Sequence, residues 1–308
     1  MKKLLLNIRD YSILIAKNIL LRPFLTKDRR NCKYKISICA IFKNEAPFLR
    51  EWIEYHSMIG VEHFYLYNNN STDDYLDVLK PYIDQGLVSL TLWNYDQAQM
   101  AAYKDFYIKH GQESNWVSFL DVDEFINPQK KENLCEWLSH MDKYPSILIY
   151  FKMFGTSGKM HHDYNKLVTE QYLVAWSGLF KVGKCLINTR YDIARYDATT
   201  HHCPQLIFPI LWTKIKVRPA NCFRLFVDWT HHFSALYNDD KATIQINHYW
   251  SKAWDVYDKK RKMTDVYFKK NPKENIGYFY KNEECNNSCD FSIFRRVMRL
   301  KFKMNIKD

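Results

Sequence analysis

Two aspartates separated by a single residue, Asp121 and Asp123, directly follow the apolar run 116–120. Carboxylates at positions i and i+2 can both reach one divalent cation when the backbone turns between them, and that cation keeps open positions for phosphate oxygens. The same spacing is also common in solvated turns. Here the run begins with Trp116 and the motif is followed by apolar Phe125, as expected at the end of a buried strand. The sequence therefore predicts a site for a divalent cation at Asp121 and Asp123.

Histidines gather in the second half of the chain as three adjacent pairs and one single residue. They are His161-His162, His201-His202, His231-His232 and His248. None of the pairs has the HExxH-type spacing of a zinc site, so we interpret the pairs as surface or polar-packing residues. His248 differs from them because it follows the apolar run 243–246, which is typical of a strand.

The segments around these residues alternate between the periodicities of strands and helices. Residues 35–42 form a β-branched run, and residues 47–59 place apolar side chains at helical spacing. The pattern continues with strands at 63–67, 87–92, 116–120, 147–151 and 243–246, and with helices at 73–82 and 97–109. This alternation predicts an α/β fold with a mostly parallel, Rossmann-like sheet flanked by helices.

Ligands bind such sheets beyond the carboxyl ends of the strands. Polar residues follow three of the predicted strands at that position: Asn44 and Glu45 after the first, the turn 68–73 after the second, and the acidic motif 121–124 after the fourth. The candidate chemistry therefore lies where the fold class predicts a binding site.

The chain has 308 residues and a formal net charge of +11, and the excess lies at its two ends. Residues 1–35 carry +8 and residues 291–308 carry +5, whereas residues 36–290 carry −2. Binding to a nucleic-acid backbone needs Lys and Arg spread over a docking face. We therefore expect no nucleic-acid partner.

Both ends have the pattern of a basic amphipathic helix. In residues 1–34 charges interrupt each apolar run, so we expect neither a spanning helix nor a cleaved signal peptide. Residues 291–308 place Phe291, Val297 and Phe302 near helical spacing, with arginines and lysines between them. Such a helix either packs on the protein body or lies in an anionic membrane interface, and two of them favour the membrane.

Eight cysteines are scattered without a paired metal or redox motif, which favours reduced thiols and a reducing compartment. Together with the basic ends, this predicts a cytoplasmic protein held peripherally on the inner face of the cell membrane.

Four blocks of the sequence carry a resemblance to a known family. They are KNEAPFLREWIEYHSMIGVEHFYLYNNNSTDD (43–74), WVSFLDVDEFINP (116–128), FGTSGK (154–159) and INHYWSKAWDVYDKKR (246–261). In this order they resemble the bacterial members of glycosyltransferase family 92 and their family-2-like relatives, which have a GT-A fold. The blocks cover most of residues 35–262.

The resemblance implies a GT-A-type domain over residues 35–262, with a nucleotide-sugar half at 35–128 and an acceptor half at 129–262. The remaining segments are then the N-terminal amphipathic segment 1–34 and, over 263–308, a linker (271–290) and a basic amphipathic helix.

The resemblance also assigns roles to residues in the shared blocks. Asn44 and Glu45 would lie beside the base or ribose, and Asn69 and Asp73 would border the same pocket. Asp121 and Asp123 would hold the donor diphosphate through Mn²⁺ or Mg²⁺. His248 would be a third metal ligand or a diphosphate contact, with His202 as the alternative, and Lys252 would be a cationic partner for phosphate.

An inverting transfer also needs a carboxylate that removes the proton of the acceptor hydroxyl. Glu124 beside the metal motif and Glu170 in the acceptor half are the candidates for this base. Asp192, Asp197 and Asp228 are further alternatives in the second half of the chain.

The resemblance predicts transfer of a hexose, with galactose as a family-level expectation, from a UDP-linked donor. The expected acceptor is a cell-surface glycan such as lipopolysaccharide, capsule or another lipid-linked saccharide. Two other functions use the same features: a membrane-surface scaffold that has lost catalysis, and a metal-dependent phosphodiesterase or nucleotidyltransferase.

Overall fold

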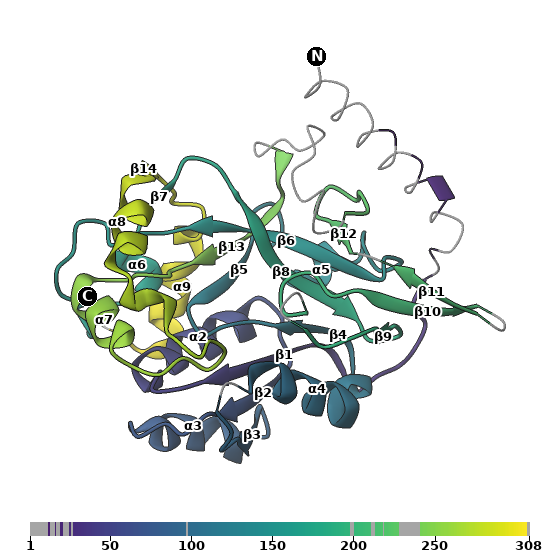
Figure 1. The fold of residues 1–308 in the computed structure, drawn as a ribbon, viewed down its shortest axis with the longest axis horizontal. Coiled ribbons are helices and arrows are strands. Elements are labelled where there is room, and N and C mark those ends of the chain that lie inside the picture. Colours follow the sequence, from purple (N-terminus) through teal and green to yellow (C-terminus); the bar gives the residue numbers. More distant parts are fainter. Residues whose placement is uncertain are drawn as a thin grey trace.

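The first half of the chain alternates strands with helices, as Figure 1 shows. The computed structural model describes residues 27–96, 98–197, 200–210, 213–217, 219–227 and 241–306, together with residues 12, 16, 19, 20 and 25. The elements of this half are β1 (Tyr34–Phe42), α2 (Ala46–Met58), β2 (His63–Asn68), α3 (Tyr75–Asp84), β3 (Val88–Leu92), α4 (Gln99–His110), η2 (Gly111–Glu113) and β4 (Ser114–Phe119). Every strand and helix predicted here is present.

The second half is richer in strands. Its elements are β5 (Glu124–Pro128), α5 (Leu134–Leu138), β6 (Ser146–Met153), α6 (Val168–Gln171), β7 (Val174–Trp176), β8 (Phe180–Asn188), β9 (Asp192–Ile193), β10 (Leu206–Ile210), β11 (Thr213–Val217), β12 (Ala220–Asn221) and β13 (Ile244–His248). The C-terminal part adds α7 (Trp254–Arg261), η4 (Pro272–Glu274), α8 (Ile276–Glu284), β14 (Asn286–Cys289) and α9 (Phe294–Met304).

The main sheet has the strand order β3-β2-β1-β4-β8-β6-β13-β5, with β12 also paired to β6. Strands β3, β2, β1 and β4 are parallel, and β8 runs antiparallel to both β4 and β6. Strand β13 is parallel to β6 and antiparallel to β5. The carboxyl ends of β1, β4, β6 and β13 therefore share one edge of the sheet, and β5 begins there.

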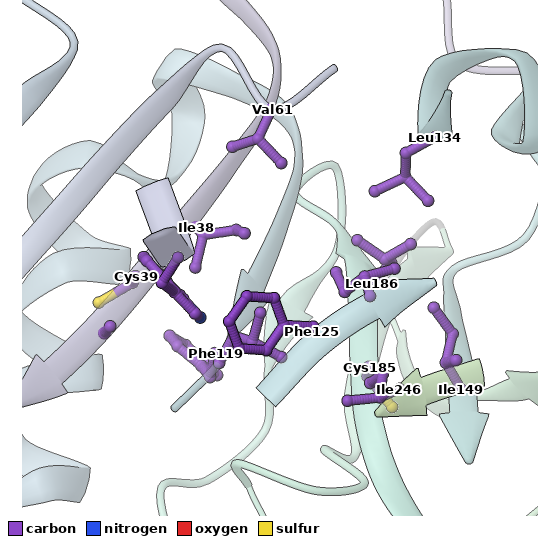
Figure 2. Packing of buried hydrophobic residues seen from close by; sticks show 14 of the residues in the cluster. Ile38, Cys39, Val61, Phe119, Phe125, Leu134, Ile149, Cys185, Leu186 and Ile246 are labelled. Carbon is purple, nitrogen blue, oxygen red and sulfur yellow. The ribbon is translucent and has the colours of Figure 1, made fainter. Parts of the chain in front are cut away.

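This arrangement confirms the predicted α/β class with a mostly parallel sheet and flanking helices. Figure 2 shows that the core is built from several strands at once, with Ile38 of β1, Phe119 of β4, Phe125 of β5 and Ile246 of β13 in one cluster. These four side chains are at most 1% exposed. The packing fixes the position of the loops at the shared edge, because a close-packed core leaves little room for shifts.

The prediction of a linker over residues 271–290 is wrong. This segment contains η4, α8 and β14, and β14 pairs antiparallel with β7 of the main body. Its polar composition suggested a linker because half-buried elements bury few apolar side chains; in α8 the buried residues are Phe279 and Asn282.

The C-terminal helix packs on the body, which is one of the two alternatives that its amphipathic pattern left open. Val297, Leu300 and Met304 are buried in the core, and α9 contacts α2 and α6. The buried guanidinium of Arg296 donates hydrogen bonds to Asn127 Oδ1 at 3.0 Å and to the carbonyl oxygen of Pro128 at 2.7 Å. The helix is therefore part of the fold.

The opposite face of α9 remains exposed. Met298 and Phe302 of this helix are 58% and 87% exposed, and Phe291, which precedes the helix, is 58% exposed. Most of the predicted N-terminal amphipathic segment, 1–34, lies outside the described residues. Within the described ranges, every helix is too short or too polar to cross a membrane.

Candidate active site

The acidic motif lines a cleft of about 340 Å³ at the shared edge of the sheet. The turn between β4 and β5 contributes the carboxylates, β13 contributes a histidine from its last position, and α7 and η4 contribute lysines. The residues that line the cleft include three carboxylates, one histidine and two lysines: Asp121, Asp123, Glu124, His248, Lys260 and Lys273.

Three of these residues form a potential metal-binding cluster. Ligand atoms of Asp123, Glu124 and His248 all lie within 4.8 Å of one another, and His248 Nε2 is 3.6 Å from Asp123 Oδ1. The backbone holds them together, because His248 and Glu124 are register partners of β13 and β5 and the amide of Tyr249 donates to the carbonyl oxygen of Asp123 at 2.8 Å. Two carboxylates and one imidazole suit a divalent ion such as Mn²⁺.

The charge states of Asp123 and His248 favour cation binding at neutral pH. Burial raises the pKa of Asp123, but Lys260 and Lys252 outweigh burial and hold the pKa well below its usual range. Burial lowers the pKa of His248 to about 4, although Asp123 opposes the shift. At pH 7 the cluster therefore offers an ionised carboxylate and a neutral imidazole with an available lone pair.

Asp121 lies beside this cluster and has other partners. Its Oδ2 accepts a hydrogen bond from Lys184 Nζ at 2.8 Å, and its Oδ1 accepts one from Gln99 Nε2 at 3.4 Å. The sequence predicted Asp121, Asp123 and His248 as metal ligands. The structure brings Asp123 and His248 together with Glu124 instead of Asp121. Asp121 still lines the cleft, with its side chain about one third exposed.

Glu124, one of the two base candidates, is almost fully buried. Its Oε2 accepts a hydrogen bond from the backbone amide of Asp121 at 3.0 Å and lies 3.6 Å from Lys184 Nζ. Burial raises the pKa of Glu124 well above its ordinary value, and the neighbouring aspartates add to this rise while Lys184 opposes it. These contacts fit a ligand of the cluster better than a base that must reach an acceptor.

Glu170, the other base candidate, is outside the cleft. It lies in α6, where its carboxylate pairs with Lys301 of α9 at 3.2 Å. Among the alternatives, Asp197 pairs with Arg195, Asp192 is in β9, and Asp228 is outside the described residues.

The predicted nucleotide-binding residues are divided between the cleft and its supporting loops. Glu45 lines the cleft, and its Oε1 lies 2.5 Å from Lys260 Nζ. Asn44 has a left-handed backbone (φ 54°), and its Oδ1 accepts from the amide of Thr72 at 2.7 Å. Asn44 therefore ties the loop after β1 to the loop after β2.

Asn69 and Asp73 also hold these loops. Asn69 Nδ2 donates to the carbonyl oxygens of Trp93 and Tyr95, at 2.8 and 2.7 Å. Asp73 Oδ2 accepts from the amide of Ala46 at the start of α2, at 2.8 Å. Neither side chain is among the described residues that line the cleft.

Lys252 is buried beneath the cleft, 1% exposed, with a left-handed backbone (φ 53°). Its Nζ lies 4.5 Å from the centroid of the Phe48 ring and has no hydrogen-bond partner within the described part of the chain. Burial lowers the pKa of Lys252 to about 8, with Lys260 adding to the shift and Asp123 opposing it.

Sequence reasoning missed three cationic residues of the site. Lys184 belongs to the buried strand β8, and a lysine within an apolar run is a signal for an acidic partner. Lys260 falls in the recognised block 246–261 but had no assigned role. Lys273 falls in the segment that was predicted to be a linker, and its Nζ donates to the carbonyl oxygen of Trp250 at 3.1 Å.

The histidine pairs have different surroundings. His201 and His202 line the cleft, with ring centroids 3.9 Å apart, and His202 Nδ1 lies 2.9 Å from the carbonyl oxygen of Gly183. Burial lowers the pKa of His202 to about 3, so its imidazole is neutral. His162 packs against Tyr172, whose hydroxyl lies 2.7 Å from His162 Nδ1, and the pair 231–232 lies outside the described residues.

Comparison with known proteins confirms the resemblance. A glycosyltransferase family 92 protein of Oryza sativa subsp. japonica is 28% identical over 242 residues, which cover 76% of this chain and 36% of that protein. Galactan beta-1,4-galactosyltransferase GALS2 of Arabidopsis thaliana is 29% identical over 134 residues, which cover 39% of this chain and 26% of that protein. The chain thus spans little more than a third of the length of the curated relatives that it matches.

Among solved structures, S. aureus TarS 1-349 in complex with UDP-GlcNAc aligns over 89% of this chain and 76% of that chain, with 12% sequence identity and a TM-score of 0.36. The sequence model of glycosyltransferase family 92 matches residues 33–287, which is well over half of the chain. The chain therefore belongs to glycosyltransferase family 92.

Proposed function

We propose that the cleft binds a nucleotide sugar and transfers its hexose to a glycan acceptor. The observation that carries this proposal is the cluster of Asp123, Glu124 and His248 beside Lys260 and Lys273 in one cleft of a family 92 chain. A metal-binding group next to lysine side chains is the arrangement that a departing nucleoside diphosphate requires, because negative charge develops on its oxygens.

Asp123, Glu124 and His248 would hold Mn²⁺ or Mg²⁺. When bound, the ion supplies Lewis-acid stabilisation to the diphosphate oxygens. Asp121, held by Lys184 and Gln99 beside this cluster, lines the cleft and would orient the donor.

The lysines of the cleft would stabilise the leaving group. Lys260 of α7 and Lys273 of η4 both line the cleft. Their ammonium groups can donate to phosphate oxygens. Lys252 adds positive charge from beneath and keeps its predicted role as a partner for phosphate.

The four residues predicted to lie beside the base and ribose, Asn44, Glu45, Asn69 and Asp73, would act in two ways. Glu45 would contact the donor directly, since it lines the cleft. The other three would act by holding the loops after β1 and β2.

We propose a UDP-linked hexose as the donor and a cell-surface glycan or glycolipid as the acceptor. The similarity to a galactan beta-1,4-galactosyltransferase supports galactose as the first hexose to test.

A panel of nucleotide sugars, each with and without Mn²⁺, tests the proposal through release of nucleoside diphosphate. The expected result is metal-dependent turnover of one UDP-hexose, accelerated by a glycan acceptor. A phosphodiesterase would cleave nucleotide diesters with no acceleration by an acceptor. An inactive scaffold would turn over no donor.

We also propose that the protein is cytoplasmic and attached peripherally to the inner face of the cell membrane. The exposed Met298 and Phe302 of α9, together with Phe291 just before the helix, would enter the interface. Arg299, whose side chain is 67% exposed, lies on the same helix and would face anionic headgroups.

A further inference from the structure

Lys260 lies between two carboxylates that come from different parts of the chain. Its Nζ is 2.5 Å from Oε1 of Glu45, which precedes α2, and 3.6 Å from Oδ2 of Asp123, which follows β4. The other carboxylate oxygen of Asp123, Oδ1, faces His248 Nε2 at 3.6 Å. One ammonium group therefore neutralises a residue of the metal-binding cluster and a residue of the donor side of the cleft.

The ammonium of Lys260 stays charged in this position. Burial lowers its pKa, but Glu45 and Asp123 outweigh burial and raise the pKa above its ordinary value. A divalent ion held by Asp123 would lie within a few ångströms of this positive charge. Like charges at such a distance repel strongly in a site partly shielded from water.

Lys260 is more accessible than Lys184. Lys184 is fully buried within strand β8 and donates to Asp121 at 2.8 Å. Lys260 sits near the end of α7, lines the cleft, and has a side chain that is 18% exposed. Its flexible four-carbon stem lets the ammonium change partners while the helix stays in place.

We propose that Lys260 is an exchangeable counter-ion that couples metal binding to donor binding. In the free protein it neutralises Asp123 and Glu45 and so weakens binding of the metal alone. When the diphosphate enters, the ammonium group of Lys260 moves from Asp123 to a phosphate oxygen. Asp123 is then free to bind the ion. Metal and nucleotide therefore strengthen each other's binding by the same factor, as linkage requires. This inference rests on the proposed function, because it takes the same cleft as the donor site.

Calorimetric titration of Mn²⁺ in the full chain tests the proposal without any turnover. Lys260→Gln is expected to bind Mn²⁺ alone on the order of tenfold more tightly than the wild type, a factor within the usual range of site-to-site coupling. In the wild type, UDP is expected to tighten Mn²⁺ binding by a similar factor, and in Lys260→Gln this gain is expected to shrink.

Two matched variants make the test specific. Lys260→Arg keeps the charge and is expected to bind Mn²⁺ like the wild type. Lys262→Gln removes a charge two residues away, from a side chain that is 63% exposed and paired with Asp258, and is also expected to match the wild type. If Lys260→Gln does not fold, the double variant Glu45→Gln/Lys260→Gln removes both charges of the pair and is expected to bind Mn²⁺ more tightly in the same way.

Unchanged or weaker binding of Mn²⁺ alone by the folded Lys260→Gln or double variant would overturn the proposal. The proposal would also be overturned if neither the wild type nor any variant bound Mn²⁺. The proposed donor site is tested separately, because binding of UDP or turnover of a UDP-hexose by the wild type can succeed or fail whatever the effect of Lys260 on the metal.

Discussion

His248 and Glu124 are direct register partners across the antiparallel pair β13 and β5, although 123 residues separate them in the chain. The pairing places both residues at the sheet edge where β4 ends, next to Asp123. Strand pairing therefore fixes the backbone of Glu124 and His248, and the hydrogen bond from the amide of Tyr249 holds Asp123 beside them.

Replacement of the histidine should weaken the metal site while leaving the fold intact. His248→Ala is expected to lower Mn²⁺ affinity by about 10- to 100-fold, because a neutral imidazole ligand is lost. Titration with Mn²⁺ measures this change. His161→Ala is the control, since His161 has an 87% exposed side chain and is outside the cleft, and equal affinities of the two variants would exclude His248 as a ligand.

Metal binding should release a proton from Glu124. The pKa of this carboxyl is well above its ordinary value because of burial, so the free protein holds a proton that a metal ion must displace. Mn²⁺ affinity is expected to rise with pH until Glu124 is ionised in the free protein. Calorimetry in buffers of different ionisation enthalpy measures the number of protons released on Mn²⁺ binding. If Glu124→Gln releases the same number of protons as the wild type, the proton comes from another group.

Lys252→Met should stabilise the protein and weaken donor binding. The folded-state pKa of about 8 lies below the ordinary 10.5, so burying the charged form costs up to about 3 kcal/mol at pH 7. Methionine removes that cost, and thermal or urea unfolding measures the gain. Nucleotide affinity, measured by titration with UDP, is expected to fall because the positive charge beneath the cleft is lost.

The same pKa shift gives the wild type a distinctive pH dependence. Between pH 8 and pH 10.5 the unfolded state binds more protons at Lys252 than the folded state, so this residue makes stability rise with pH. Lys252→Met should lack this rise. The same slope in both proteins would show that Lys252 does not titrate in this range.

The two faces of α9 should respond differently to truncation. Leu300→Ala is expected to lower the free energy of unfolding by about 2–5 kcal/mol, because Leu300 is fully buried. Phe302→Ala, at an 87% exposed position, is expected to change it by less than about 0.5 kcal/mol.

Co-sedimentation with anionic vesicles at low salt tests the proposed membrane contact of the same helix. Phe302→Ala is expected to reduce binding, while Met160→Ala, at another exposed apolar position outside α9, is the control. Equal binding by wild type and Phe302→Ala would argue against insertion of this face.

The strands that contribute buried residues to the sheet could be predicted from local patterns. The runs that became β1, β4 and β13 are rich in apolar and β-branched residues, and their ends correctly indicated the edge where the cleft lies. Asp123 and His248 could therefore be assigned to one site from the sequence and the resemblance.

Other parts of the site depend on long-range pairing that no local pattern reveals. Strand β5 is short, ends in Pro128, and pairs with β13, which lies far away in the sequence. This pairing places Glu124 in the metal-binding cluster, whereas Asp121 pairs with Lys184. Lys273 was missed because η4 lies in a polar segment whose fold is set by contacts with α7 and α8.

The assignment of the cleft as a metal-assisted glycosyltransferase site is tested most directly by donor turnover. Turnover by the wild type is compared with turnover by Asp123→Asn, with the best nucleotide sugar from the panel and saturating Mn²⁺. The substitution keeps the size of the side chain and removes the charge that holds the ion. Asp77→Asn, in the first turn of α3 and outside the cleft, is the control. Turnover is expected to fall by at least about 100-fold in Asp123→Asn and to match the wild type in the control. Turnover by Asp123→Asn close to that of the wild type would contradict the assignment of this cleft as a metal-assisted glycosyltransferase site.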